Sequence, residues 1–369
     1  MSALRIIDAD GHVMEPKGMW EAWIEPAFKA RAPRVVKEAR INVDGHLVPR
    51  PDGGNQISAG MQASFKGKVN EFLAKYHEAG YSAEAQLRAM DEAGIEISFV
   101  YPTQGLYAAS IDDLDPAFAI AICRAYNNWV LEYCQVDPRR LRPIAMLTAL
   151  HDPSLAVEEA TRAAGLGMRG VFVRPNPIRG RNLDDPTYEP LWAECERLGL
   201  AVGVHEGVGA RLPAAGADRY PHFLGSHSAS HPLEQMLAML GLITGGVLDR
   251  HPRLRVAFLE SGCGWLPYWL WRLDEHREKT EGVAGEPQLP LKPSDYFRRQ
   301  CWISCEPDEP YLREVLDFIG EDRLLFASDY PHPDHKWPET VENARALLIS
   351  DRAKRKMFWD NPSALYSLS

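Results

Sequence analysis

Ionisable side chains follow short apolar segments at separate places in the chain. The first such segment ends with Asp8, Asp10 and His12, and two later segments end at His205 and Asp329. A catalytic divalent cation takes a few nitrogen and oxygen ligands from rigid elements, and two carboxylates balance its charge. The sequence therefore predicts a site for one divalent metal ion, with zinc or manganese preferred and iron also compatible. Its expected ligands are Asp10, His12, His205 and Asp329.

Other polar residues at segment ends are candidates for catalysis or substrate binding. Asp329 and His205 would take part in catalysis at the metal, and Glu260 would either ligate the metal or act as a general base. Arg174 suits a substrate carboxylate, because its planar guanidinium can pair with both oxygens. The alternative for Arg174 is a salt bridge within the site, for instance to Glu206.

Three further candidates have structural alternatives. Glu306 is either a substrate contact or an acidic residue that opens a loop. His231, with His227 in the same Ser-His-Ser-Ala-Ser-His segment, either reaches the substrate from a loop or packs at the start of a helix. His332 follows Asp329 by three residues and could orient it.

The segments that carry these residues recur as eight short apolar runs without strict alternation of polar and apolar residues. This pattern is typical of parallel strands buried on both faces. Helical patterns lie between them at 115–135, 152–165, 189–198 and 232–248, two of them opening with Asp-Pro. Strands that alternate with helices predict an α/β fold, and eight strands predict a (β/α)8 TIM barrel. The expected strands are 4–10, 97–101, 141–147, 170–174, 200–205, 255–260, 301–306 and 324–329.

Two connections are longer than a simple turn. Residues 15–93 form a long insertion after the first strand, and residues 206–230 form an irregular loop after the fifth. Both leave the carboxyl ends of strands, where barrel active sites lie, so either could cover the site or support a dimer. We expect one domain over residues 1–369.

Composition excludes several classes of function. The 369 residues carry a net charge of -10 without a run of Lys or Arg, which disfavours nucleic acid as a partner. No segment approaches the roughly 20 apolar residues of a membrane helix, and the N-terminus has no secretory leader. The six cysteines lack CxxC spacing, so reduced thiols in a cytoplasmic protein are expected.

Several motifs, in this order and spacing, resemble the amidohydrolase superfamily. They are Ile-Asp-Ala-Asp-Gly-His at 7–12, Arg-His-Pro-Arg-Leu-Arg at 250–255, the segment 262–267, Ala-Ser-Asp-Tyr-Pro-His at 327–332 and Asn-Pro-Ser-Ala-Leu-Tyr at 361–366. The chain is most similar to the amidohydrolase-related group that includes aminocarboxymuconate-semialdehyde decarboxylase and γ-resorcylate decarboxylase.

The resemblance implies a residue-x-His pair on strand one, a His on strand five and an Asp on strand eight as metal ligands. Asp10-Gly-His12, His205 and Asp329 match these positions. It also implies a homodimer, which the apolar segment from Trp265 to Trp271 would support. One position departs from the family, because Glu260 stands where the group usually carries a strand-six His.

Three functions are compatible with these residues. We expect hydrolysis of a small organic substrate, aromatic or bearing a carboxylate, by a metal-activated water that Asp329 or Glu260 deprotonates. The alternative is non-oxidative decarboxylation of an aromatic or conjugated acid held by the metal and Arg174, with Asp329 moving the proton. The third, a metal-binding protein without catalysis, fits poorly with so many ionisable groups at one rim.

Overall fold

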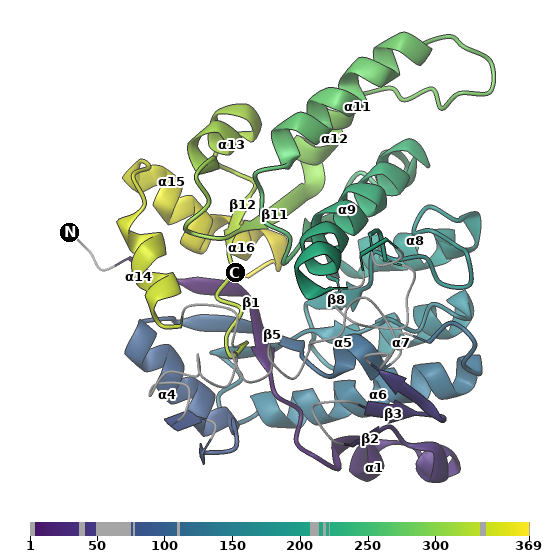
Figure 1. Cartoon of the computed structure of the whole chain (residues 1–369), viewed down its shortest axis with the longest axis vertical. Coiled ribbons are helices and arrows are strands. Elements are labelled where there is room, and N and C mark those ends of the chain that lie inside the picture. Colours follow the sequence, from purple (N-terminus) through teal and green to yellow (C-terminus); the bar gives the residue numbers. More distant parts are fainter. Residues whose placement is uncertain are drawn as a thin grey trace.

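The computed structural model describes residues 4–36, 41–48, 75–76, 78–108, 111–206, 214–216, 219–220, 222–332 and 337–368. Short parallel strands lie at the centre of the molecule, and helices surround them (Figure 1). The third expected strand is divided into two pieces, because Ile144 interrupts it while its amide N–H still donates to the carbonyl of Val100. The strands are β1 (Ile7–Val13), β5 (Ile97–Pro102), β6 (Leu141–Pro143) with β7 (Ala145–Met146), β8 (Gly170–Val173), β9 (Ala201–Val204), β10 (Arg255–Phe258), β11 (Cys301–Cys305) and β12 (Leu324–Phe326).

The strands follow one another in chain order around a closed ring. The order is β1-β5-β6 in one sheet and β7-β8-β9-β10-β11-β12 in the other, and every pair is parallel. The ring closes between β1 and the segment after β12. There the N–H of His12 donates to the carbonyl of Tyr330 at 2.7 Å, and the N–H of Asp329 donates to that of Asp10 at 3.2 Å. The expected α/β fold with parallel strands is confirmed, and these two hydrogen bonds are consistent with the predicted (β/α)8 TIM barrel.

Three strands end two or more residues away from the sequence-based bounds. β1 continues to Val13, so His12 lies within the strand rather than beyond it. β10 and β12 end two or three residues before Glu260 and Asp329. These two residues have φ values of 50° and 52°, in the left-handed region, and this conformation ends the extended backbone.

Helices connect the strands, and several begin at residues with clear helix-start signals. The side chain of Asp115 accepts from the N–H of Ala117, and that of Asp152 accepts from the N–H of Ser154. The main helices are α4 (Ala83–Ala93), α6 (Pro116–Cys134), α7 (Pro153–Gly165), α8 (Glu189–Leu198), α9 (Phe223–Thr244), α10 (Val247–Arg250), α11 (Leu266–Thr280), α12 (Pro293–Gln300), α13 (Leu312–Ile319), α14 (Glu339–Ala346), α15 (Asp351–Arg355) and α16 (Asn361–Leu365).

The α9 helix begins nine residues before its expected start at Pro232. The side chain of His222 accepts from the N–H of Gly225 and caps this early start. Pro232 therefore lies inside the helix, where it removes one backbone hydrogen bond. The expected loop over 206–230 is correspondingly shorter, and His227 and His231 lie on a helix instead of in a loop.

The long insertion contains its own small elements. They are α1 (Met19–Trp23), a 3-10 helix (Pro26–Arg31) and an antiparallel sheet of β2 (Arg34–Val35), β3 (Ile41–Val43) and β4 (His46–Val48). Residues 49–74 of the insertion lie outside the described residues. Glu15 anchors the start of the insertion, because its carboxylate accepts from the N–H groups of Gln104 and Gly105, both at 2.8 Å.

The barrel interior is filled by aromatic side chains beneath the rim. The Tyr366 ring, from the C-terminal segment, stacks on Phe99 with ring centres 3.5 Å apart. Its hydroxyl donates to the carbonyl of Ala9 at 2.8 Å and lies 2.9 Å from the Tyr101 hydroxyl. Gly203 makes room for the Tyr101 ring, since a Cβ at Gly203 would come within 2.5 Å of the Tyr101 hydroxyl.

All six cysteines are buried and unpaired, in agreement with the expected reduced thiols. Within the described residues, none of the helices is both long and apolar enough to span a bilayer.

Glu15 predicts a pH dependence of stability. Burial raises the pKa of Glu15 from 4.5 to about 7, although the two backbone N–H groups oppose the shift. The folded state therefore keeps a proton that the unfolded state loses, so this contribution to stability is lost as pH rises from 4.5 through 7. The free energy of urea unfolding of wild type relative to Glu15→Gln should fall by about 3 kcal/mol between pH 4.5 and pH 8. The exposed control Glu158→Gln should show no such change, and equal slopes for wild type and Glu15→Gln would contradict the prediction.

Candidate metal centre

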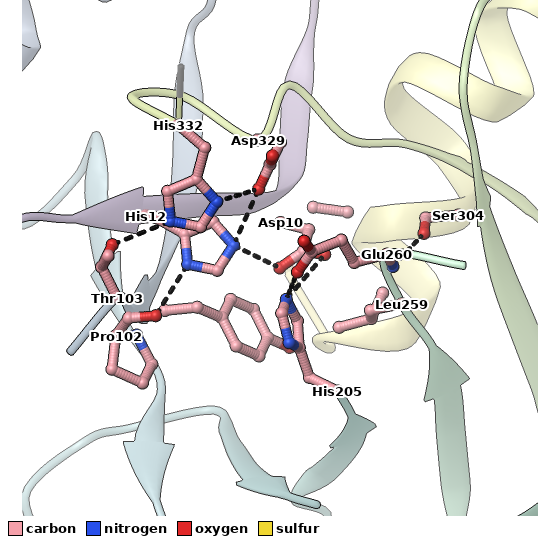
Figure 2. A network of polar contacts seen from close by, with 12 residues as sticks. Asp10, His12, Pro102, Thr103, His205, Leu259, Glu260, Ser304, Asp329 and His332 are labelled. Carbon is pink, nitrogen blue, oxygen red and sulfur yellow. Dashed lines mark hydrogen bonds and ion pairs between the residues drawn. The ribbon is translucent and has the colours of Figure 1, made fainter. Parts of the chain in front are cut away.

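The barrel brings the four expected metal ligands together at the carboxyl ends of its strands (Figure 2). Nε2 of His12 lies 3.7 Å from Oδ1 of Asp10 and 3.2 Å from Oδ1 of Asp329. Nε2 of His205 lies 3.7 Å from the other oxygen of Asp10. All four side chains are buried, with exposed fractions of 3% or less.

The hydrogen bonds of the two imidazoles fit a metal ion. Nδ1 of His12 lies 2.8 Å from the carbonyl of Pro102, and Nδ1 of His205 lies 2.8 Å from the carbonyl of Glu206. A carbonyl only accepts, so each Nδ1 carries a hydrogen and each Nε2 faces the carboxylates, where it could ligate a cation through its lone pair. Among the described residues, neither Nε2 atom nor Oδ1 of Asp10 has a hydrogen-bond partner. Lone pairs that converge in this way suit a shared cation.

Burial and charge shift the pKa values of these groups in opposite directions. Burial lowers the pKa of His12 to about 4, which keeps the ring neutral and able to ligate. Burial also raises the pKa of Asp10 well above its usual value. Burial opposes charge on His205, but Asp10 and Glu260 outweigh it and raise its pKa to about 9. A divalent cation would replace that proton as the source of positive charge among the carboxylates.

Asp8 is held away from this cluster. Its carboxylate accepts from the Ser98 hydroxyl at 3.2 Å, and from the N–H and hydroxyl of Ser328 at 2.9 and 2.7 Å. Strict alternation would place Asp8 on the same face as Asp10, but the register of β1 shifts between Asp8 and Gly11. A Cβ at Gly11 would come within 2.5 Å of the Asp8 carboxylate. Asp8 therefore links β1 to its neighbours and is not placed to ligate.

His332 contacts the Asp329 carboxylate and is itself held by Thr103. Nδ1 of His332 lies 2.8 Å from Oδ1 of Asp329, and its Nε2 lies 3.0 Å from the Thr103 hydroxyl. Thr103 follows β5, so this contact connects the rim across the barrel closure. The structure thus agrees with the expectation that His332 orients Asp329, and it adds Thr103, which no sequence pattern indicated.

Glu260 enters the same cluster as a third carboxylate. Its Oε2 forms an ion pair with Nε2 of His205 at 2.8 Å, and its Oε1 lies 3.7 Å from Nε2 of His231. Four residues, His12, Glu260, Asp329 and His332, each offer one possible ligand atom, and these four atoms all lie within 4.8 Å of one another. The Glu260 N–H donates to the Ser304 hydroxyl at 3.1 Å, which fixes the backbone that aims the side chain.

The three expected substrate contacts occupy different places. Arg174 is buried, but its Nη2 pairs with Asp112 and with the carbonyl of Pro177 rather than with Glu206. His231 is buried on α9 beside Glu260. Glu306 is exposed, and the structure does not bring it into the buried cluster. Their roles in substrate binding stay predictions.

A family model described as amidohydrolase matches residues 7–368. The chain belongs to the amidohydrolase family. This amidohydrolase is 31% identical over 283 residues to a gamma-resorcylate decarboxylase from Rhizobium sp. (strain MTP-10005), covering 73% of the chain and 83% of the relative. It is 26% identical over 315 residues to a 2-amino-3-carboxymuconate-6-semialdehyde decarboxylase from Dictyostelium discoideum, covering 80% and 83%.

The fold of the amidohydrolase also matches solved structures. A dihydroxybenzoic acid decarboxylase from Polaromonas sp. JS666, with bound manganese and the inhibitor 2-nitroresorcinol, superimposes with a TM-score of 0.69 at 19% identity. The match covers 99% of this chain and 97% of that one. The match of the family model over residues 7–368 confirms the amidohydrolase-superfamily assignment made from sequence motifs, and the solved structures support the fold.

The geometry predicts the metal content of the purified protein. We expect about one divalent ion per chain, and His12→Ala and His205→Ala should each lose most of it, because each change removes a buried lone pair aimed at the cluster. Elemental analysis by mass spectrometry after gel filtration measures this. His276→Ala, at an exposed position on α11, is the matched control and should keep its metal. Full metal content in the double variant His12→Ala/His205→Ala would refute the site.

Proposed function

We propose that this amidohydrolase-family enzyme catalyses the metal-dependent, non-oxidative decarboxylation of a small aromatic or conjugated acid. The observation that carries the proposal is its similarity to decarboxylases, at 31% identity over 83% of the gamma-resorcylate decarboxylase from Rhizobium. The relative from Dictyostelium discoideum, named for a conjugated carboxymuconate substrate, supports the same class of reaction. This reverses the order of the two hypotheses drawn from sequence, in which hydrolysis came first.

The charge of the site also favours decarboxylation over hydrolysis. Asp10, Asp329 and Glu260 place three carboxylates around the position of one divalent cation. Three anions overcompensate a 2+ charge, so water bound there is less acidic and a metal hydroxide forms less readily. Hydrolysis by a metal-activated water depends on that hydroxide, whereas loss of CO2 does not. Glu260, which suggested a general base for hydrolysis from the sequence alone, therefore supports decarboxylation instead.

The described residues supply the remaining requirements of the reaction. A bound divalent cation, manganese by analogy with the decarboxylase from Polaromonas, would supply Lewis acidity toward the substrate oxygens. During decarboxylation the bond from the ring carbon to the carboxylate breaks, its electron pair stays on that carbon, and a proton takes the place of CO2. The Asp329 carboxylate, held by His332 at 2.8 Å, would first take up a proton from the substrate acid or from solvent and then pass it to this carbon. No oxidant or reductant is needed.

Variants of Glu260 separate the two reactions. The manganese-loaded enzyme should release CO2 from at least one hydroxylated aromatic or conjugated acid, measured in a coupled assay beside a panel of esters and amides. Glu260→His, which lowers the negative charge at the metal, should preserve or raise CO2 release. Glu260→Gln should not produce the roughly 10²–10⁴-fold loss expected when a general base is removed. The control Glu278→Gln, at an exposed position on α11, should match wild type, and hydrolysis without CO2 release would overturn the proposal.

Exposed apolar side chains support the proposed homodimer. Leu237 of α9 and Tyr268 and Trp271 of α11 are exposed by 51%, 58% and 50%. The two helices are joined by a hydrogen bond from the Trp269 indole to the carbonyl of Met236 at 3.0 Å. Large exposed apolar side chains on two neighbouring helices favour association of two copies.

Light scattering tests the assembly. At micromolar concentration we expect twice the chain mass of 41.4 kDa. Trp271→Glu should shift the mass toward the monomer, because association would bury the new charge. Val283→Glu, at a position that is 48% exposed beyond the end of α11, is the matched control and should stay dimeric. A wild-type mass near 41.4 kDa would contradict the prediction.

A further inference from the structure

A second buried polar cluster lies beside the metal centre, between the ends of β8 and β9 and the α9 helix. Arg174 and Asn176 follow β8, Glu206 follows β9, and His231 and Glu234 face them from α9. Each is exposed by 5% or less. The amide of Asn176 donates to Oε1 of Glu206 at 3.4 Å, and Glu206 interacts electrostatically with Arg174, His231 and Glu234. We call these five residues the β8–β9 polar cluster.

The β8–β9 polar cluster contains buried polar atoms without partners. Among the described residues, Oδ1 of Asn176, Oε2 of Glu206, Nε2 of His231 and two nitrogens of Arg174 make no hydrogen bond. Buried polar atoms are almost always paired in folded proteins, because leaving them unpaired costs their hydration. Several such atoms from three different elements, next to a catalytic rim, indicate a place where a substrate group completes the hydrogen bonding.

The charges of the cluster select the kind of group. The charge of Arg174 is already neutralised by Asp112, and its Nη2 also donates to the carbonyl of Pro177 at 2.7 Å. Glu206 and Glu234 add further acidic groups, so the cluster has no surplus positive charge for a second carboxylate. The unpaired acceptors, Oδ1 of Asn176 and Oε2 of Glu206, require a donor, and the two unpaired nitrogens of Arg174 require an acceptor. A hydroxyl or an amide of the substrate supplies both.

We propose that the β8–β9 polar cluster binds a neutral hydrogen-bond donor of the substrate, a hydroxyl or an amide N–H, at a position away from the reacting carboxylate. The assignment rests on the proposed function in one respect, that the substrate is an acid whose carboxylate lies at the metal. His231 lies 3.7 Å from Oε1 of Glu260 in the metal centre and interacts electrostatically with Glu206, so the two clusters adjoin each other through this imidazole. Arg174 then supports the cluster, in place of the carboxylate-binding role expected from its chemistry alone.

Binding of simple probes tests the assignment without turnover. Benzoate, 3-hydroxybenzoate, 4-hydroxybenzoate, isophthalate and terephthalate are titrated into manganese-loaded protein by calorimetry. The ortho isomer is left out, because its hydroxyl could chelate the metal. At least one hydroxybenzoate should bind about tenfold or more tightly than benzoate, since its hydroxyl pairs a buried acceptor. Both dicarboxylates should bind more weakly than benzoate, because the cluster is acidic.

Variants locate the preference within the cluster. Glu206→Leu and Asn176→Leu should each remove most of the preference for the hydroxybenzoate while leaving benzoate affinity and manganese content close to wild type. Glu206→Gln keeps an acceptor oxygen and should retain part of the preference. Glu189→Gln, paired with Arg250 on the outside of the barrel, is the matched control and should behave as wild type.

The outcomes are distinct from those of the decarboxylation assay. Equal affinities for benzoate and both hydroxybenzoates, tightest binding of a dicarboxylate, or binding of none of the probes to manganese-loaded protein would overturn the assignment. A preference that survives both leucine variants would also overturn it. Absence of CO2 release with a clear hydroxyl preference would instead refute only the proposed reaction.

Discussion

Closure of the barrel between β1 and the segment after β12 is the constraint on which the site depends. Two backbone hydrogen bonds and the carboxylate of Asp8, which bonds Ser328 at a separation of 320 residues, hold these segments together. The closure places Asp10 and His12 beside Asp329. Without it, the carboxylates from the two ends of the chain would not share a cation, because each comes from a different strand of the ring.

The site concentrates features that a stable core avoids. Buried imidazole and carboxylate groups converge with lone pairs facing one another, and the residues that carry two of the carboxylates, Glu260 and Asp329, hold left-handed backbone conformations. Such features persist where the surrounding structure over-determines them, and they gather at functional sites. The packed layer of Phe99, Tyr101 and Tyr366 beneath the rim provides that rigid support.

Glu260, which stands where the related group usually carries a strand-six His, is accompanied by a second difference nearby. Glu260 adds negative charge at the metal, and α9 brings the imidazole of His231 within 3.7 Å of it. An imidazole is therefore still present at this part of the rim, but it comes from a helix. The His231 imidazole can therefore take the place of the strand-six His, although Glu260 occupies its position in a chain whose relatives are decarboxylases.

The sequence by itself predicted the barrel and the buried His and Asp residues that gather at its rim, because buried parallel strands have a strong apolar signature and their carboxyl ends meet at one rim. It also indicated Glu260 as the unusual residue. Only the tertiary structure decided which neighbours those residues have. The register shift that removes Asp8 from the cluster, the early start of α9 that carries His231, and the pairing of Arg174 with Asp112 all depend on contacts between distant segments. Local propensity does not encode such contacts, because they form only when the whole ring closes.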